Sequence, residues 1–446
     1  MIAGKTFNQW CQSHPLFVPI AATAPVCWTN TKLQDAKFAL NALTITPSQL
    51  SDAAARLERF GGYLAQQFPQ LPSNGLIESP LVCGAPLLQQ LNKDPNQVAI
   101  KNLWLKCDHQ LPISGSIKAR GGFHEILKHA EQLAIAHNLI SVTDDYRQLT
   151  TKPCLDLFAQ HSIVVGSTGN LGLAIGIISA KLGFNVTVHM SDDAKQWKKD
   201  KLRQHGVTVI EHQGDYGVAV EAGRAISEND PNSHFVDDEN SVDLFMGYAV
   251  AALRLEQQLK DQGIVVDQDH PLFVYLPCGV GGAPGGITWG LKTIFNNNVH
   301  CFFAEPTHSP AMLLGLYTEL HQDISVNDLA IDNKTQADGL AVGRPSGFVG
   351  KALQHLINGC YTLEDDRLFE LLALTYQTMG LTIEPSAAAS IAGPATIMSD
   401  PHYLKQQGLL NKVDNINHIA WTTGGDMVPW QQMSQFIAKG QRLLTQ

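Results

Sequence analysis

The sequence predicts an α/β protein that combines a large parallel-sheet domain with a smaller inserted α/β domain. Short β-branched runs alternate with helical runs between residues 162 and 240, and the same order recurs after residue 270. Alternating strands and helices are typical of a parallel sheet with helices on its faces. The composition agrees with this class, because 44% of the 446 residues are hydrophobic, 16% are charged and 37 are glycines.

Residues 162–240 carry the first alternation. The expected strands are "SIVVG", "NVTVHM" and "GVTVIEH", and the expected helices include "LGLAIGIISAKLG" and "YGVAVEAGRAIS". Strands and helices that alternate at this pace are typical of a parallel sheet with helices on its faces, so these elements form one compact unit set inside a larger α/β body. We therefore expect residues 162–240 to form the small domain.

The rest of the chain supplies the larger domain. "PLFVYLP", "GGITWGLKTIF" and "VHCFFAEP" repeat the order strand, helix, strand, and "NHIAWTT" adds a strand-like segment near residue 420. We assign residues 241–446 to this domain, and residues 1–161 to an N-terminal extension followed by the first part of the same domain. Within the extension, residues 48–68 have apolar positions at helical spacing after a Ser cap, which predicts a helix that packs on the larger domain.

Charge and missing motifs exclude several classes of protein. The formal net charge is −10 and no stripe of Lys and Arg is present, which argues against a nucleic-acid partner. No apolar run approaches the roughly 20 residues that span a bilayer, and the first residues lack the apolar core of a signal peptide, so we expect a cytoplasmic protein. Eight cysteines without a C-x-x-C pair and 17 histidines without metal-ligand spacing predict neither a disulfide framework nor a zinc site.

Lys118 lies in "LPISGSIKARGGFHEIL", between a Ser/Gly turn and a double glycine at the expected start of a helix. Small, flexible residues at such a place let a ligand approach the backbone closely, although a charged side chain there could simply be solvated. Lysine shifts its pKa readily when it is desolvated, and the positive end of the following helix would favour the neutral, nucleophilic amine. Lys118 is therefore a candidate to form a Schiff base with an aldehyde cofactor.

The first loop suited to an anion is in "VVGSTGNLGLAIG". Ser167, Thr168, Gly169 and Asn170 lie there between a buried strand and the start of a helix. Backbone N–H groups at a helix start are unpaired and carry partial positive charge, which favours a carboxylate or a phosphate. An ordinary capped turn between a strand and a helix would need no ligand at this place.

The second loop is in "YLPCGVGGAPGGITWGLK", whose glycines stand at 279, 281, 282, 285 and 286. So many glycines cost conformational entropy, and close approach of the backbone to a phosphate is a reason to keep them. The dinucleotide fingerprint fails because Pro284 occupies its last glycine position, and no G-x-x-x-x-G-K-[ST] loop is present. Nicotinamide cofactors and nucleoside triphosphates are thus disfavoured.

A lysine beside two anion-binding glycine loops, without a nucleotide motif, predicts pyridoxal 5′-phosphate as the cofactor. A third strand end, "WTTGGDMVP", offers the hydroxyls of Thr422 and Thr423 to a ring nitrogen or a charged ligand, or forms an ordinary turn.

At these residues the chain resembles the fold type II family of pyridoxal-phosphate enzymes and, within it, the bacterial D-serine dehydratases (D-serine ammonia-lyases). The resemblance runs from about residue 110 to 430 through "SGSIKARGG", "VGSTGNLGLAIG", "FVDDENS", "PCGVGGAPGG", "FFAEPTHSP", "DGLAVGRPSGFVG" and "TTGGDMVP". It implies a fold type II architecture, a monomer and the β-elimination of D-serine to pyruvate and ammonia, with D-threonine as a further substrate.

The resemblance also implies roles for the cofactor residues. Lys118 would hold the cofactor aldehyde, Asn170 would hydrogen-bond its 3′ oxygen, and Thr423 would face the pyridine nitrogen. The phosphate would be cradled by the glycine loop, which comprises Gly279, Val280, Gly281 and Gly282. Two positions depart from the glycine that the family pattern leads us to expect, namely Ala283 and Asp426.

For the substrate, the resemblance implies that Ser167, Thr168, Gly169 and Asn170 hold the carboxylate through backbone N–H groups, with Thr168 close to the reacting carbon. Asp238 would position the departing oxygen, although "DDEN" could equally be a solvated acidic turn. Glu305 would lie near a monovalent cation, K⁺ or Na⁺, or in an ordinary ion pair.

Three alternative functions share these motifs. An L-serine or L-threonine dehydratase would use the same lysine and glycine loops, because chirality is not readable from motif spacing. A β-replacement synthase would form the same 2-aminoacrylate and then add a second nucleophile to it. A cofactor carrier without catalysis would need no substrate loop, and the substrate loop argues against it.

Overall fold

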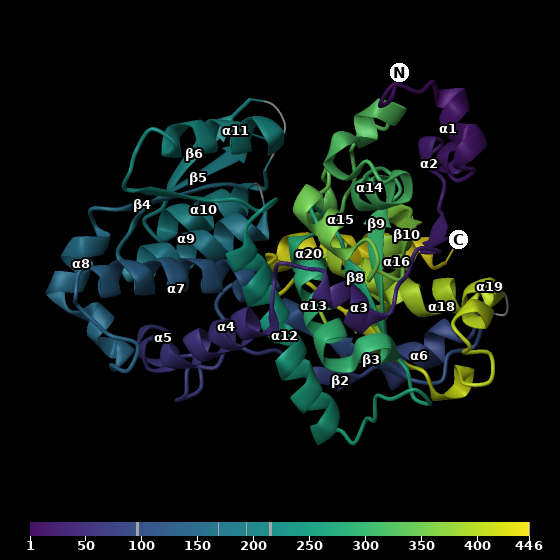
Figure 1. The fold of residues 1–446 in the computed structure, drawn as a ribbon, viewed down its shortest axis with the longest axis horizontal. Helices are drawn as coiled ribbons and strands as arrows, with labels where there is room; N and C mark the ends of the chain where they lie inside the picture. Colours follow the sequence, from purple (N-terminus) through teal and green to yellow (C-terminus); the bar gives the residue numbers. More distant parts are fainter. Residues whose placement is uncertain (95–97, 168, 193, 214–215, 446) are drawn as a thin grey trace. The chain divides into compact units, whose positions relative to one another are not determined.

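The computed structural model describes residues 1–94, 98–167, 169–192, 194–213 and 216–445 (Figure 1). The chain divides into two units. Unit 1 comprises Met1–Thr44, Ser79–Gln110 and Ala251–Gln446, and unit 2 comprises Ile45–Glu78 and Leu111–Val250. Unit 2 contains the whole of the expected small domain and also Lys118, which the sequence had assigned to the first part of the larger domain.

Unit 1 is built on a seven-stranded sheet with the order β1-β10-β9-β8-β11-β3-β2. The inner five strands are parallel, whereas β1 and β2 pair antiparallel at the two edges. In chain order the strands are β1 (Cys27–Thr29), β2 (Leu81–Cys83), β3 (Leu103–Lys106), β8 (Leu272–Pro277), β9 (Val299–Pro306), β10 (Gly359–Leu363) and β11 (Asn417–Trp421). Strands β8 and β9 are buried along their whole length, as the central strands of a sheet covered on both faces are.

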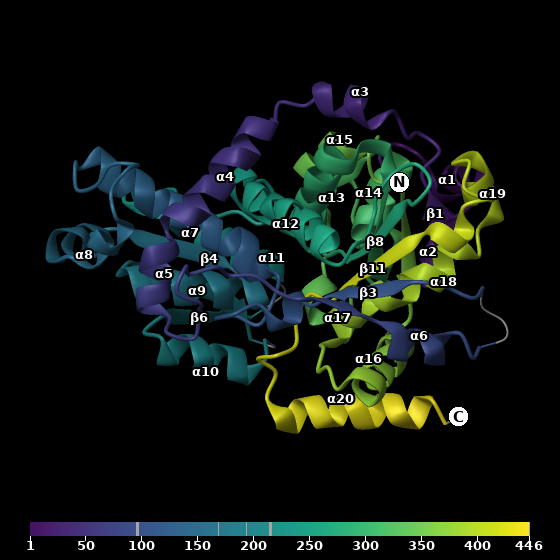
Figure 2. The same ribbon diagram turned by 90° about the horizontal axis from the view of Figure 1, so that it is seen from below.

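Helices cover both faces of this sheet. Figure 2 shows α16 and α20 on one side of the sheet and α13 and α15 on the other. The helices that lie wholly in unit 1 are α1 (Phe7–Ser13), α2 (Phe17–Ala21), α3 (Ala36–Asn41), α6 (Ala85–Leu91), α13 (Gly282–Phe295), α14 (Ala311–Thr318), α15 (Gly347–Leu353), α16 (Asp365–Met379), α17 (Pro385–Ala388), α18 (Gly393–Met398), α19 (Pro401–Gln406) and α20 (Trp430–Leu443).

Unit 2 is built on a four-stranded parallel sheet with the order β6-β5-β4-β7. Its strands are β4 (Ser162–Gly166), β5 (Asn185–Ser191), β6 (Thr208–His212) and β7 (Ser233–Val236). Its helices are α4 (Pro47–Arg59), α5 (Gly61–Gln67), α7 (Lys118–Ala136), α8 (Lys152–Phe158), α9 (Asn170–Leu182), α10 (Gln196–Gln204) and α11 (Tyr216–Ser227). The division between the units falls inside α12 (Val242–Asp261).

The helical segment expected at 48–68 belongs to unit 2 and not to the larger domain. It forms α4 and α5, and α4 is fixed to α7 by a buried ionic network. Glu131 of α7 accepts from Arg56 Nε at 2.6 Å, from Arg59 at 2.7 Å and from the Tyr146 hydroxyl at 2.6 Å. Burial alone would raise the pKa of Glu131, but these hydrogen bonds lower it on balance. The expectation that this segment belongs to the larger domain was wrong because Glu131, the polar partner of the amphipathic helix α4, lies on a distant segment of the chain.

Within the residues that the structure describes, none of the helices combines the length and the apolar character needed to cross a membrane.

Candidate active site

Lys118 is the first residue of α7, as predicted. The chain turns into the helix through Gly115, whose φ of +56° is a left-handed conformation that glycine adopts without strain. The residues before the helix are buried, including Ser114 and Ser116. The turn therefore holds Lys118 at the end of a rigid helix of 19 residues.

The Lys118 amine faces a carboxylate and an aromatic ring within unit 2. Its Nζ lies 3.5 Å from Oδ2 of Asp238 and 5.7 Å from the centre of the Tyr248 ring, and 22% of the lysine side chain is exposed. The other oxygen of Asp238, Oδ1, has no hydrogen-bond partner among the described residues. The structure thus brings Asp238, which the sequence proposed, to the lysine, and it adds Tyr248, for which the sequence gave no signal.

The protonation state of Lys118 differs from the expected one. Burial alone would lower the pKa of the amine, but the charge of Asp238 and the Tyr248 hydroxyl outweigh burial and raise it. The expectation that the helix start would favour a neutral amine is therefore wrong for this state of the chain. Lys118 becomes a nucleophile only when its proton leaves, and the carboxylate of Asp238 stabilises the charged form.

A close crossing of two helices sets this arrangement. A Cβ atom added at Gly121 of α7 would lie 2.5 Å from the Tyr248 ring and 2.7 Å from the carbonyl oxygen of Leu244. One added at Gly247 of α12 would lie 2.6 Å from Cβ of His124. Gly121 therefore serves helix packing, and not the approach of a ligand that its sequence context suggested. The crossing holds Tyr248 beside Lys118.

The turn between β4 and α9 is closed by Ser167. Its hydroxyl accepts from the N–H groups of Gly169 at 3.3 Å and Gly172 at 3.1 Å, and its own N–H donates to the carbonyl of His189 at 2.9 Å. Asn170 is the first residue of α9, and Thr168 lies outside the described residues. A Cβ added at Gly169 would meet no atom of the described residues within 4 Å. Ser167 thus holds the backbone of Gly169 and Gly172, and the described residues leave the space beside Gly169 open.

The glycine loop of unit 1 fits a phosphate. Gly281 has a φ of +118° and precedes α13, which begins at Gly282. No hydrogen-bond acceptor is found, within the described part of the chain, for the N–H groups of Val280, Gly281 and Gly282. Buried N–H groups without acceptors are costly, and at the start of a 14-residue helix they favour an anion. The donor set is what the phosphate of pyridoxal phosphate requires.

The two threonines after β11 differ in their environment. Thr422 is fully buried; its hydroxyl donates to the carbonyl of Lys106 at 3.1 Å and lies 2.8 Å from Nδ1 of His109. Burial lowers the pKa of His109 to about 4, so this ring is neutral. Thr423 makes no hydrogen bond to other described residues, and its hydroxyl remains available to a ligand.

The two departures from the family pattern lie in different environments. Ala283 is buried in the first turn of α13. Asp426 is exposed, and nothing in the structure explains it.

Glu305 lies in β9 and is fully buried. Its two oxygens accept from the N–H groups of Met312 at 2.7 Å and Leu313 at 2.9 Å, at the start of α14. Burial raises the pKa of this carboxyl to about 8, against the opposing effect of the two N–H donors. It has no ion-pair partner among the described residues, in which no group of three or more acidic, His or Cys side chains could hold a metal ion.

Known proteins match this chain along nearly its whole length. Residues 79–407 match the family model described as "Pyridoxal-phosphate dependent enzyme". A protein of Halalkalibacterium halodurans named "Probable D-serine dehydratase" is 55% identical over 97% of this chain and 98% of its own length. A Pseudomonas putida protein of the same name is 53% identical over 99% of both chains.

Solved structures share the fold at low identity. The diaminopropionate ammonia lyase of Escherichia coli aligns with a TM-score of 0.70 at 17% identity, covering 93% of this chain and 97% of that one. The processed threonine deaminase isoform 2 of Solanum lycopersicum aligns with a TM-score of 0.63 at 19% identity, covering 94% of this chain and 95% of that one. The fold type II architecture implied by the sequence motifs is confirmed, and this chain belongs to the family of pyridoxal-phosphate dependent enzymes.

Proposed function

We propose that this chain converts D-serine to pyruvate and ammonia, with pyridoxal phosphate held by Lys118. The observation that carries the proposal is the identity of 53–55% with the two relatives named D-serine dehydratase, over 97–99% of the chain. The position of Lys118 at the start of α7, with Asp238 3.5 Å from its amine, supports the chemistry.

Each contact expected with the cofactor is assigned to a residue of the chain. Lys118 takes the aldehyde, and the N–H groups of the loop from Gly279 through Val280 and Gly281 to Gly282 take the phosphate. Asn170 is assigned to the 3′ oxygen and Thr423 to the pyridine nitrogen. When bound, the cofactor supplies an electron sink for the bond that breaks at the α-carbon of the substrate.

Proton transfer falls to the residues around Lys118. The freed Nζ removes the proton from the α-carbon, and this requires that the amine first become neutral. Asp238 stabilises the ammonium form in the state described, and we assign it to the departing hydroxyl oxygen once substrate is present. Tyr248, whose ring centre lies 5.7 Å from the amine, restricts the directions from which the amine can be approached.

The substrate carboxylate is assigned to the turn at the start of α9. Ser167 shapes this turn through its hydroxyl, since its own N–H is already bonded to His189. Gly169, beside space that the described residues leave open, and Asn170, at the first position of α9, are assigned to the carboxylate. Thr168, which lies outside the described residues, is assigned to the neighbourhood of the reacting carbon on the family resemblance alone.

Gly169→Ala is expected to raise the KM for D-serine about tenfold or more and to leave the thermal stability unchanged. Among the described residues the added methyl meets no atom within 4 Å, and the φ of −122° suits alanine, so we expect the substitution to affect ligand binding and not the fold. Steady-state kinetics and a melting curve check this. Gly166→Ala is the contrast, because its Cβ would lie 2.4 Å from Cα of Val220, and it should destabilise the fold. An unchanged KM in Gly169→Ala would contradict the assignment.

Gly281→Ala is expected to weaken cofactor binding about tenfold. Alanine is strained at a φ of +118°, and its Cβ would lie 2.3 Å from Cε of Met312. Strain of about 1–3 kcal/mol moves the loop that carries the N–H groups. Titrating the cofactor-free protein with pyridoxal phosphate measures the affinity. Ala283→Gly is the matched control and should bind as tightly as the unaltered chain; equal affinities of all three proteins would exclude this loop as the phosphate site.

The test of the function is keto-acid release from D-serine, L-serine and D-threonine, each supplied separately to the cofactor-loaded protein. Pyruvate from D-serine at a rate well above that from L-serine is the expected result. A preference for L-serine would favour the L-serine or L-threonine dehydratase alternative. A product that forms only with an added thiol would favour a β-replacement synthase.

We also propose a monovalent cation, K⁺ or Na⁺, at Glu305. A buried carboxylate without an ion-pair partner among the described residues is an oxygen ligand that suits a hard ion. The pKa of Glu305 is about 8 in the folded chain, against an ordinary value of 4.5. Without a cation, this carboxyl therefore lowers the stability of the fold progressively as the pH rises from 4.5 to 8. A cation offsets that cost.

K⁺ is therefore expected to raise the melting temperature more at pH 8.5 than at pH 6.5, relative to choline at equal ionic strength. Glu305→Gln should lose this difference because it cannot become charged. Equal K⁺ effects in both proteins would place the cation elsewhere.

For the assembly and location of the chain we propose a monomer in the cytoplasm. Light scattering on the eluting protein gives the mass, which is 48.6 kDa for one chain. A measured mass of twice that value would contradict the proposal.

A further inference from the structure

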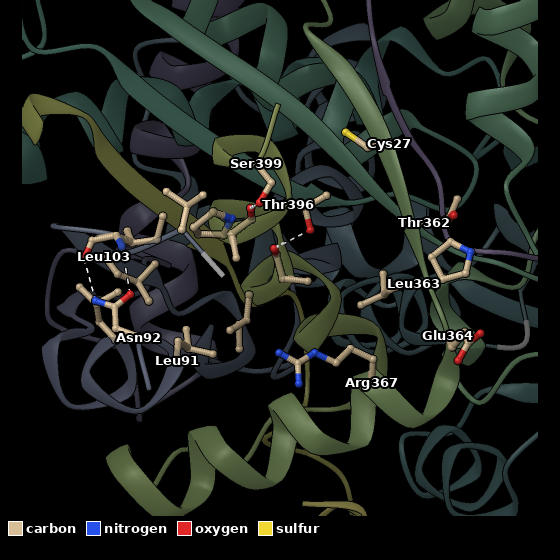
Figure 3. Close-up of a pocket in the computed structure, with 18 of the residues that line it drawn as sticks. Cys27, Leu91, Asn92, Leu103, Thr362, Leu363, Glu364, Arg367, Thr396 and Ser399 are labelled. Carbon is tan, nitrogen blue, oxygen red and sulfur yellow. Dashed lines mark hydrogen bonds between the residues drawn. The ribbon is translucent and has the colours of Figure 1, made fainter. Parts of the chain in front are cut away.

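Unit 1 holds a cavity of about 410 Å³ that the proposed reaction does not use. It lies among α6, α16, α18 and the start of β1, and Figure 3 shows the side chains that line it. Most of its wall is aliphatic, with Leu88 and Leu91 from α6, Leu363 from the end of β10, and Ile391 just before α18. Val98 also lines the cavity, and its side chain is 41% exposed.

The size of the cavity sets it apart from a packing defect. Protein interiors are packed so closely that voids larger than a water molecule are few. Pockets for small molecules are typically about 300–1,000 Å³ and mostly apolar, with a small number of polar groups. At about 410 Å³ this cavity has the volume and lining of a small-molecule site.

Several polar groups in the wall already have partners in the chain itself. The side-chain amide of Asn92 donates to the carbonyl of Ile100 at 2.8 Å and accepts from its N–H at 3.0 Å. Thr396 and Ser399 donate back into α18, to the carbonyls of Ala392 at 2.9 Å and Ala395 at 2.7 Å. These side chains therefore need no hydrogen bond from a ligand.

Arg367 differs from these groups. Figure 3 shows its guanidinium extending into the cavity from α16. One of its N–H groups donates to Glu370 at 2.6 Å, and 36% of the side chain is exposed. Guanidinium carries five N–H donors in a planar fork, so donors remain that can bind a carboxylate. Glu364, three residues earlier at the N-cap of α16, also lines the cavity, and its negative charge disfavours a ligand with more than one carboxylate.

Covalent capture by the cavity is disfavoured. Cys27 lines the wall, but burial, with a smaller effect of Asp400, raises the pKa of its thiol to about 12. The thiol is then protonated at neutral pH, and the thiolate is the nucleophilic form. A ligand there is held by its contacts alone.

We propose that this cavity binds a monocarboxylate with an aliphatic tail, of the kind found in medium-chain fatty acids. The tail fills the wall formed by α6, β10 and α18, and the carboxylate pairs with Arg367. The site is distinct from the loop at Gly279–Gly282 and from Lys118, and it does not depend on the function proposed above.

Octanoate is the probe, with octanol as its uncharged counterpart, added to the cofactor-loaded full chain and followed by calorimetric titration and melting temperature. Octanoate should bind and raise the melting temperature, and octanol should bind more weakly. Arg367→Gln should weaken octanoate binding about tenfold and leave octanol unchanged, because one charge-assisted hydrogen bond is lost. Ala395→Leu, which fills the cavity from α18, should abolish binding of both without lowering the melting temperature of the free protein.

Three outcomes would overturn the proposal: no binding to the unaltered chain, octanoate binding that survives in Ala395→Leu, or octanoate binding that is unchanged in Arg367→Gln. The second would mean that octanoate occupies another site, and the third that the carboxylate is not recognised here. If Ala395→Leu fails to fold, a crystal structure with octanoate decides by whether its density lies against Arg367.

Discussion

Lys118→Ala is expected to lower pyruvate release from D-serine by at least about 10³-fold. The amine at the start of α7 is both the attachment point for the cofactor aldehyde and the base that takes the α-proton, so its loss removes two functions at once. The absorption band of the lysine-bound cofactor should vanish in the same variant. A coupled pyruvate assay and an absorption spectrum measure the two effects.

The matched control is Lys128→Ala. Lys128 lies on the same helix and pairs with Asp243, away from the amine of Lys118. Its replacement should leave the absorption band and the rate close to those of the unaltered chain. Should Lys118→Ala keep the band and the rate, another amine must hold the cofactor, and the proposed site would be wrong.

Gly121→Ala is expected to lower the free energy of unfolding of unit 2 by about 2 kcal/mol or more. Alanine is the better helix former by about 1 kcal/mol, but its methyl would stand 2.5 Å from the Tyr248 ring and 2.7 Å from a backbone oxygen. A backbone atom cannot yield as a flexible side chain can, so α7 and α12 must move apart. Tyr248 then leaves Lys118, and the cofactor band should weaken as well.

Gly122→Ala, one residue further along α7, is the control that distinguishes the steric effect of the added methyl from its effect on helix propensity. Its methyl would meet the tips of Ile175 at 3.2 Å and Leu171 at 3.5 Å, which can adjust. Urea unfolding followed by circular dichroism should give a change below about 1 kcal/mol for this variant. Equal losses of unfolding free energy in Gly121→Ala and Gly122→Ala would mean that the close crossing of α7 and α12 does not cause the destabilisation.

Long buried elements were the part of the fold that could be predicted from sequence. "SIVVG" and "VHCFFAEP" coincide with β4 (Ser162–Gly166) and β9 (Val299–Pro306), because continuous runs of apolar residues mark strands covered on both faces. The edge strands β1 and β2 have three residues each, which is too short for any periodicity. The sequence also did not reveal that α4 belongs to unit 2, because this depends on its ion pairs with Glu131, which lies far along the chain.

The candidate site was predictable where a local motif carries the chemistry. Lys118 and the glycine loop stand at helix starts, and both starts can be read from neighbouring residues. Tyr248 could not be found, because it lies inside an ordinary helical pattern and reaches the lysine only through the Gly121–Gly247 crossing. The raised pKa of Lys118 was missed for the same reason, as it depends on partners that only the fold brings close.

The place of β11 in the large sheet bears on how the chain acquires its structure during synthesis. β11 follows β8, β9 and β10 in the chain, yet it lies between β8 and β3. Until residues 417–421 leave the ribosome, β3 and β8 each present an unpaired edge to solvent. Exposed strand edges invite aggregation, so nascent chains that stall before this point should depend on chaperones. Unit 2 lacks this constraint, because its sheet is complete by residue 236.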